Sequence, residues 1–426
     1  MLFQFGPRSA LLLPFVVPGA VAALWLLVRA ARRGTWPDAW LALLIVVPTF
    51  SIAQWMLGFA GWYDSHDGYS TAMFYVPWQL NLLLGPAYYF YFRSLASQEF
   101  RPGLRIWGHL GPGILRVALF GVALAYDLGW WRGLRGQALP YHFGTKGPVA
   151  QWLDGLSQPV AYLLYPLLPL YCWWVLADYR RYTHYLNDNF SDPERLRFAG
   201  FRQLLLLQVG SLGLSLLFEV LDGVFDFGYV QAWYYFVLRG LFIYALIAVG
   251  LQANYAAASN PLRFDPDALP DAPAAEPGAV ADHPKGVMGE PDSVLDEPDS
   301  VLGSPKMPAS LPPELRPWRA RLLALMADEQ PWLEPELTLT ELAQRLRTNP
   351  GLLSKVINTG CGQNFNDFVN TYRVQEACRK LADARFAHYS LVGVALESGF
   401  NSKSTFNRVF KKLTGQAPGE VTRPKS

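Results

Sequence analysis

Charged residues are scarce in this chain. Asp, Glu, Lys and Arg make up 16% of its 426 residues, below the roughly 25% usual in soluble domains. Hydrophobic residues reach 51% and aromatic residues 15%. The net charge of +2 conceals an uneven distribution, since the segment from Glu314 to the end holds 16 Lys and Arg against 11 Asp and Glu, while the first half is nearly uncharged. The length allows two or three domains, and we expect them to occupy different environments.

Residue types that build disulfides, metal centres and catalytic sites are also few. The three cysteines, Cys172, Cys361 and Cys378, have no metal-ligand spacing with histidines, and we interpret them as reduced thiols. No His/Glu metal motif, phosphate loop or Ser/His/Asp order is found around the six scattered histidines, which are His66, His109, His142, His184, His283 and His388. We therefore predict no catalytic residue, metal or cofactor, and a protein that is not an enzyme.

Long apolar runs dominate the first 250 residues. About 20 apolar residues are needed for a helix to cross a membrane. Seven such runs are found, at Leu11–Val28, Ala39–Phe59, Met73–Phe92, Trp107–Ala125, Leu156–Ala177, Gln203–Leu221 and Ala232–Leu251. A cleavable signal peptide is the alternative for the first run, but its positive flank is weak and six further runs follow. The sequence therefore predicts an all-α protein whose residues 1–253 form a seven-span transmembrane bundle.

The basic residues between the runs predict the orientation, because cytoplasmic loops retain Lys and Arg. Four basic residues lie in the N-terminal stub and the loops after runs two, four and six, namely Arg8, Arg132, Arg135 and Lys146. Eleven lie after runs one, three and five, namely Arg29, Arg32, Arg33, Arg93, Arg101, Arg105, Arg180, Arg181, Arg195, Arg197 and Arg202. The N-terminus is thus predicted outside and the C-terminus in the cytoplasm.

Three ionisable residues fall within the predicted spans. Arg116, Glu219 and Arg239 are costly at such depths unless they are paired, and a Glu219–Arg239 or Glu219–Arg116 pair would neutralise them. Two interpretations of these residues remain: a structural ion pair and a signal-binding site.

Residues 254–313 have the composition of a disordered linker. Between Asn254 and Pro305 there are ten acidic residues and only two basic ones, Arg263 and Lys285. A seven-residue sequence is repeated there, at Glu290–Asp296 and Glu297–Gly303. Such low-complexity sequence favours a flexible tether. Docking of its Val and Leu residues on a partner, or proteolytic release of the following domain, are alternatives.

Helical periodicity returns in residues 314–426. An amphipathic helix is predicted over Trp318–Glu329. A capping box of Thr338 and Glu341 opens a helix over Leu339–Leu346, and Asn349 with Pro350 begins another that ends near Thr359. These two short helices form a helix-turn-helix.

The pattern then repeats. A longer helix is predicted from Phe365 to about Leu381, with Arg373, Arg379 and Lys380 facing outward. Ser390 caps a helix to Glu397, Gly399 supplies a turn, and Ser402 caps a last helix. The buried side of that helix is Phe406, Val409, Phe410 and Leu413, and its outer side is Lys403, Ser404, Asn407, Arg408, Lys411 and Lys412.

This tandem resembles the DNA-binding domain of AraC/XylS-type bacterial transcription regulators, over roughly Leu325 to Arg423. The resemblance is closest at Gly399–Gly415 and Pro418, and Gly360, Gly362, Phe365 and Tyr372-Arg373-Val374 also follow the family pattern. Arg347 departs from the pattern at a turn where glycine is usual, and Gly351 departs where a larger base-reading side chain is common. The bundle ahead of the tandem resembles the membrane-embedded branch of the family.

The resemblance implies which residues meet double-stranded DNA. Arg and Lys donate to guanine, and Asn pairs with adenine, whereas other basic residues meet phosphate. The implied base-reading residues are Ser354, Lys355, Lys403, Ser404, Asn407 and Arg408. The implied phosphate or secondary contacts are Gly351, Asn358, Arg379, Lys411 and Lys412. Homodimerisation is a further implication.

The sequence thus predicts a membrane-anchored, sequence-specific transcription regulator in a bacterial inner membrane. Its partners would be DNA, the lipid bilayer and an unidentified small-molecule or membrane signal sensed by the bundle. The alternative is a transporter or membrane enzyme with an attached DNA-binding regulatory domain.

Overall fold

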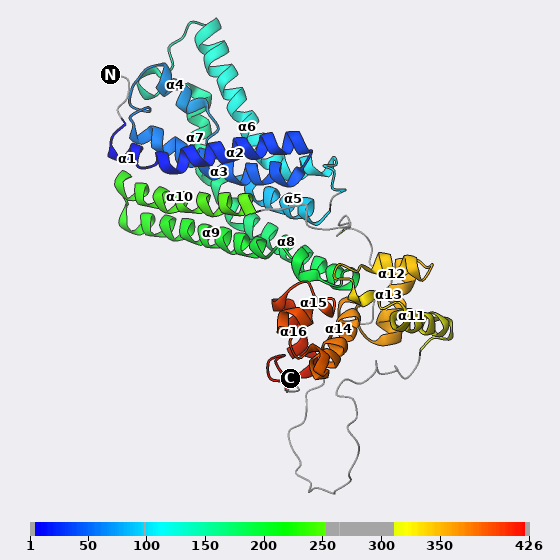
Figure 1. The fold of residues 1–426 in the computed structure, drawn as a ribbon. Coiled ribbons are helices and arrows are strands. Elements are labelled where there is room, and N and C mark those ends of the chain that lie inside the picture. The colour runs from blue at the N-terminus through cyan, green and yellow to red at the C-terminus, as the bar shows by residue number, and fades with distance from the viewer. Residues whose placement is uncertain (1–4, 98, 253–263, 265–310, 422–426) are drawn as a thin grey trace, which may run out of the picture. The chain divides into compact units, whose positions relative to one another are not determined.

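The computed structural model describes residues 5–97, 99–252, 264 and 311–421 (Figure 1). Over these residues the secondary structure is helical, with two isolated β-bridges and no strand, which confirms the predicted all-α class. The chain divides into two compact units, one of residues 1–180 and 198–264 and one of residues 181–197 and 265–426. The predicted linker at 254–313 lies almost entirely outside the described residues, so the boundaries 1–253, 254–313 and 314–426 stay predictions.

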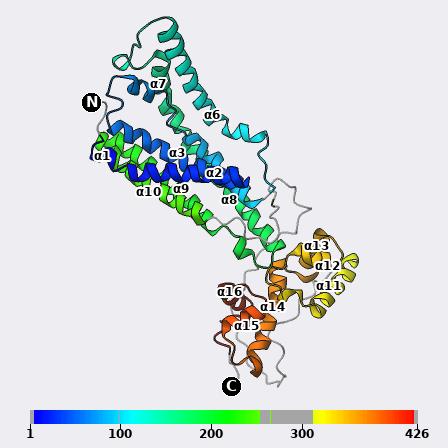
Figure 2. The same ribbon diagram turned by 45° about the horizontal axis from the view of Figure 1, so that its top comes forward.

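The first unit is a bundle of long helices. Its helices are α1 (Pro7–Ala10), α2 (Leu13–Arg33), α3 (Trp36–Phe59), α4 (Gly68–Tyr75), α5 (Leu84–Ala96), α6 (Arg105–Leu124), α7 (Pro148–Tyr162), α8 (Leu164–Asn189), α9 (Ala199–Phe225) and α10 (Tyr229–Gln252). Helix α3 is central, because it contacts α2, α5 and α10, and α2, α3 and α10 lie side by side in both views (Figure 2). Helix α8 begins in this unit and ends in the other.

Five helical segments among the described residues are long and apolar enough to cross a membrane. They are Pro7–Arg33, Trp36–Phe59, Arg105–Leu134, Gln203–Phe225 and Tyr229–Ala248. They correspond to the first, second, fourth, sixth and seventh predicted runs. The predicted count of seven is therefore not confirmed.

The third predicted run, Met73–Phe92, is not one continuous helix. Helix α4 ends at Tyr75, and α5 begins only at Leu84. Between them Val76 is extended, with φ −88° and ψ 128°. The physical reason is Pro77, whose ring disfavours the helical conformation of the residue before it.

The fifth predicted run, Leu156–Ala177, is also interrupted. Helix α7 ends at Tyr162 and α8 begins at Leu164. Pro166 explains the break, because a proline ring inside a helix clashes with the carbonyl four residues earlier, here that of Tyr162. In the first turn of a new helix the same proline is tolerated.

Besides the end of α8, the second unit contains six α-helices in its described residues. They are α11 (Arg316–Asp328), α12 (Leu339–Arg345), α13 (Pro350–Cys361), α14 (Phe365–Ala382), α15 (Leu391–Glu397) and α16 (Lys403–Thr414). Short 3-10 turns at Pro193–Leu196, Pro331–Leu333 and Ala384–Phe386 belong to the same unit. Each predicted helix of the C-terminal segment is present, with ends that differ by at most a few residues.

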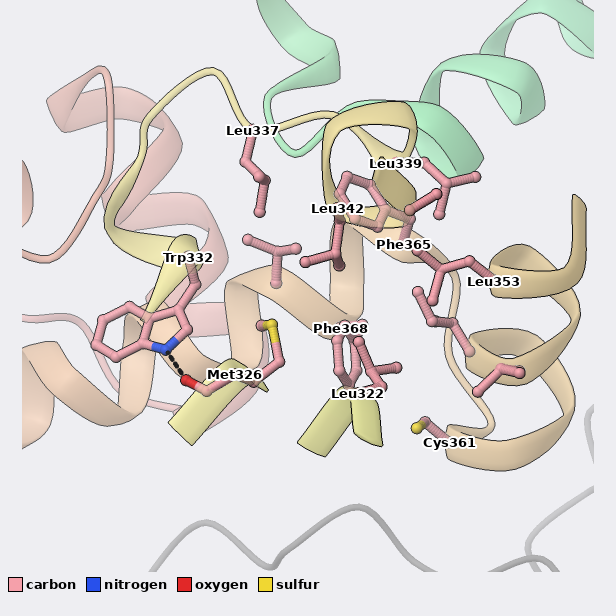
Figure 3. Packing of buried hydrophobic residues seen from close by; sticks show 14 of the residues in the cluster. Leu322, Met326, Trp332, Leu337, Leu339, Leu342, Leu353, Cys361, Phe365 and Phe368 are labelled. Atoms are coloured by element: carbon pink, nitrogen blue, oxygen red, sulfur yellow. Dashed lines mark hydrogen bonds between the residues drawn. The ribbon is translucent and has the colours of Figure 1, made fainter. Parts of the chain in front are cut away.

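Helix α14 joins two separate hydrophobic cores. Its first half places Phe365 and Phe368 among residues of α11, α12 and α13 (Figure 3). Its second half places Val374 and Ala377 among residues of α15 and α16. Trp332 closes the first core, with its indole nitrogen donating to the Met326 carbonyl at 3.0 Å. The two helix-turn-helix motifs are thus packed on one shared helix.

Candidate DNA-binding interface

The first helix-turn-helix, α12 and α13, is fixed by side-chain caps at both helix starts. The Thr338 amide donates to the Glu341 carboxylate at 2.8 Å, and the Glu341 amide donates to the Thr338 hydroxyl at 3.2 Å, which is the predicted capping box. The Asn349 side chain accepts from the Leu352 amide at 2.7 Å. In the turn, Arg347 adopts a φ of +54°, a left-handed conformation that favours glycine.

The second helix-turn-helix, α15 and α16, has the same design. The Ser390 hydroxyl accepts from the Gly393 amide at 3.0 Å, and the Ser402 hydroxyl accepts from the Thr405 amide at 3.2 Å. Gly399 makes the turn with a φ of +85°. Its backbone also lies so close to the loop before α12 that an added Cβ would be 2.5 Å from the Trp332 carbonyl oxygen. Only glycine satisfies both constraints.

The predicted base-reading residues lie on the outer faces of α13 and α16. On α16, Phe406 and Phe410 are fully buried. The residues exposed on the other side are Lys403, Ser404, Asn407, Arg408, Lys411 and Lys412. On α13, Gly351, Lys355 and Asn358 are exposed and Ser354 is half-buried. The structure thus brings each predicted set together on one helix, and their contacts with DNA stay a prediction.

Several of these side chains already have partners within the second unit. Arg408 forms an ion pair with Glu194 at 3.2 Å, and Lys412 forms one with Asp367 at 2.7 Å. On α14, Arg379 pairs with Glu376, and its guanidinium nitrogens lie 2.6 and 2.8 Å from the carboxylate oxygens. On α13, the side-chain amide of Asn358 donates to the Ser354 hydroxyl at 3.3 Å.

Arg373 was predicted to face outward, but the structure shows it buried. Its side chain is only 1% exposed, and it donates to the carbonyls of Trp332 at 2.8 Å and Glu334 at 2.7 Å. Burial lowers its pKa to about 10, so the guanidinium stays charged at neutral pH. The sequence contained the signal, since Arg373 is four residues from both Val369 and Ala377 on the buried stripe of α14.

Lys380 was also predicted outward and is buried. Its Nζ lies 3.4 Å from the Glu376 carboxylate and donates to the Glu397 carbonyl. That carbonyl ends α15, and a cation at a helix C-terminus is favourable. Lys380 is three residues after Ala377, so the same buried stripe accounts for its position.

The three ionisable residues of the predicted spans are not joined by an ion pair in the described structure. Arg116 is 9% exposed and donates to the Gln79 side chain at 2.7 Å. The Arg239 guanidinium lies over the Tyr235 ring at 5.6 Å. Glu219 is exposed on α9. The neutralising pair and a signal site there both stay predictions.

Residues 190–195 contact the helix-turn-helix motifs, which the sequence analysis did not predict. Phe190 forms an isolated antiparallel bridge with Thr338, and the Ser191 amide donates to the Leu337 carbonyl at 3.1 Å. The contacting residues are more than 140 positions apart in the chain. No local pattern predicts such a pairing.

Comparisons with known proteins agree with this geometry. Residues 342–424 match the helix-turn-helix domain family. The HTH-type transcriptional regulator YtdP of Bacillus subtilis (strain 168) is 36% identical over 92 residues, which are 22% of this chain and 12% of that protein. An HTH-type transcriptional regulator of Staphylococcus aureus (strain COL) is 35% identical over 83 residues, which are 20% of this chain and 11% of that protein.

The similarity therefore spans about an eighth of these relatives and is confined to one segment of this chain. No solved structure matches the chain. The matched segment covers α13 to α16 and most of α12, with the turns at Arg347 and Gly399 and the caps at Asn349, Ser390 and Ser402. The C-terminal part of this chain is thus a helix-turn-helix domain of the AraC type.

Proposed function

We propose that this protein is a membrane-anchored transcription regulator, in which the bundle receives a signal and the C-terminal domain binds a promoter. The observation that carries the proposal is α16, a capped helix with an aromatic buried face and an exposed face of Lys403, Ser404, Asn407 and Arg408. Such a helix suits the major groove of DNA, where polar and basic side chains distinguish base pairs. The relatives named as HTH-type transcriptional regulators support it.

Base reading and phosphate binding are assigned to different residues. Asn407 and Arg408 lie in the middle of the exposed face of α16, and they are proposed to read bases together with Lys403, Ser404, Ser354 and Lys355. Lys411 lies in the last turn of α16 and is proposed to meet phosphate. Gly351, Asn358, Arg379 and Lys412 are the further proposed backbone contacts. Phosphate contacts set affinity and register, whereas base contacts set sequence preference.

Membrane anchoring is supported by apolar side chains on the surface of the first unit. Helix α9 exposes a set of residues that comprises Leu206, Leu207, Val209, Leu216, Leu217, Val220, Val224 and Phe225. Water does not favour so large an apolar surface, whereas a hydrocarbon core accommodates it. The distribution of arginines between loops supports an N-terminus outside and a C-terminal domain in the cytoplasm of a bacterial cell.

A signal site is proposed at Arg116. It borders a cavity of about 140 Å³ that Gln54, Tyr63, Gln79 and Asp154 also line. The Arg116 guanidinium donates to the Gln79 side chain, which lines the same cavity, and guanidinium donors suit an anionic or hydrogen-bond-accepting group. Arg116→Gln is expected to change transcription from the target promoter without changing DNA affinity of the purified protein. Arg132→Gln is the control, because Arg132 is exposed and does not line this cavity, and both properties are expected to stay unchanged.

The direct test of the DNA-binding function uses the full-length protein in detergent micelles. Genomic fragments bound by the protein are selected, and affinity for the enriched site is compared with that for a scrambled site over a range of salt concentrations. We expect tighter binding to the enriched site and a steep loss of affinity with salt. The absence of binding to either fragment at low salt would contradict the proposal.

A further inference from the structure

Residues 190–195, here named the docking segment, are anchored in the DNA-binding unit by Ser191. This serine is 1% exposed. Its hydroxyl accepts from Arg373 Nη2 at 3.1 Å, and its carbonyl accepts from the Asn366 side chain at 2.7 Å. Its amide donates to the Leu337 carbonyl at 3.1 Å. A buried residue with all its polar groups bonded is a specific attachment and not a chance contact.

The docking segment then places two carboxylates beside the second helix-turn-helix. The Asn401 side chain donates to the Asp192 carboxylate at 3.2 Å, and Asn401 directly precedes Ser402, the cap of α16. Glu194 forms ion pairs with Arg197 at 2.6 Å and with Arg408 at 3.2 Å. These contacts put negative charge beside the N-terminal half of the recognition helix, where DNA would bring phosphates and acceptor groups.

The position of the docking segment in the chain links it to the bundle. Helix α8 ends at Asn189, one residue before Phe190. The docking segment therefore follows directly in the chain from a helix that begins in the bundle. Residues 181–197 belong to the same compact unit as the helix-turn-helix motifs, so this route does not depend on the predicted linker.

We propose that the docking segment is an inhibitory partner of the DNA-binding domain. Ser191 seats it against Arg373, and Glu194 occupies Arg408, so docking and DNA binding are antagonistic. A signal that displaces α8 releases Arg408 for DNA. This inference rests on the proposed DNA-binding function, because it assigns regulation to the same helix.

The first test removes the competing charge without removing the anchor. In full-length protein in detergent micelles, Glu194→Gln is expected to tighten DNA binding by up to about fivefold at low salt, since exposed ion pairs contribute up to that factor. Glu314→Gln is the matched control, because Glu314 is an exposed acid outside the docking segment. Equal affinities of wild type, Glu194→Gln and Glu314→Gln would overturn the proposal.

The second test locks the segment in place. Asp192→Cys with Asn401→Cys, in a Cys378→Ser background, introduces two thiols at positions whose native side-chain ends, Asn401 Nδ2 and Asp192 Oδ2, are in hydrogen-bond contact, and formation of the cross-link is verified by mass spectrometry. Oxidation is expected to weaken DNA binding at least about tenfold, because no released fraction remains, and reduction is expected to restore it. Unchanged affinity of the oxidised, cross-linked protein would contradict the inhibitory role. Loss of DNA binding in every variant and in wild type would instead contradict the proposed function.

Discussion

Arg373 donates a hydrogen bond of 2.8 Å from its Nε to the carbonyl oxygen of Trp332. The same guanidinium reaches the Glu334 carbonyl at 2.7 Å and the Ser191 hydroxyl at 3.1 Å. One buried side chain thus ties the shared helix α14 to the loop before α12 and to the docking segment. Because both cores contain residues of α14, the relative placement of α13 and α16 depends on this helix.

Replacing Arg373 by methionine removes these donors while retaining an apolar stem. The buried Trp332 carbonyl would be left without its donor, and the part-buried bond to Glu334 would also be lost. We expect a loss of about 2–4 kcal/mol in the unfolding free energy of this unit. Hydrogen exchange of the amides in α14 and α16 measures the loss as faster exchange. Arg385→Met, at a position 78% exposed, is the control and should leave exchange unchanged. Equal protection in both variants would show that the Arg373 bonds do not hold the unit.

Gly399 and Gly415 form a matched pair for testing close packing. Both have positive φ, +85° and +76°, so alanine is strained at each by about 1 kcal/mol. Only at Gly399 would the Cβ also meet atoms, 2.5 Å from the Trp332 carbonyl oxygen and 3.0 Å from Leu333 Cα. We expect Gly399→Ala to lower the thermal unfolding midpoint clearly more than Gly415→Ala does. Similar midpoints for the two variants would mean that backbone strain alone, without close packing, accounts for the requirement for glycine at position 399.

Asn407 and Lys411 separate sequence reading from phosphate binding. Asn407→Ala is expected to cost about 1–3 kcal/mol at one base position and to relax preference there. Lys411→Ala is expected to weaken binding to all sequences alike and to reduce the salt slope by about one. Competition assays with a library of single-base site variants distinguish the two patterns. A uniform loss for Asn407→Ala would remove it from the base-reading residues.

Ionisation of Glu376 is expected to make the stability of the folded protein depend on pH in a defined direction. The hydrogen bonds from Arg379, together with the charge of Lys380, hold the pKa of its carboxyl below the ordinary 4.5. A depressed folded-state pKa stabilises the protein above the unfolded pKa, and this stabilisation is lost as pH falls through the folded value. Glu376→Gln should therefore flatten the fall in unfolding midpoint below about pH 4.5, whereas Glu314→Gln should not. An unchanged acid profile would show that the pair contributes nothing to stability.

The sequence predicted the C-terminal domain well because its determinants are local. Thr338 with Glu341, Asn349, Ser390 and Ser402 each cap a helix within three residues, and turns and caps of this kind are legible without tertiary contacts. The outer faces of α13 and α16 followed from helical periodicity for the same reason. Local sequence pattern is therefore sufficient to group the candidate base-reading residues on one face of each helix.

The errors came from residues whose position is decided by distant contacts or by a single proline. Arg373 and Lys380 were placed outside because charge usually marks a solvated face, yet carbonyls at Trp332 and Glu397 make their burial favourable. The broken third and fifth runs reflect Pro77 and Pro166, which hydropathy alone does not register. The Ser191 anchor pairs segments far apart in the chain and has no local pattern.

The most direct test of the account is to map, in living cells, the genomic sites bound by the full-length protein and by the Lys403→Ala/Asn407→Ala double variant. We expect discrete promoter sites for the native protein while it remains in the membrane fraction. We also expect loss of those sites in the variant at equal abundance and in the same membrane fraction. Site occupancy unchanged by the double variant, or no discrete sites for the native protein, would contradict the claim that α16 reads promoter DNA from a membrane-anchored chain.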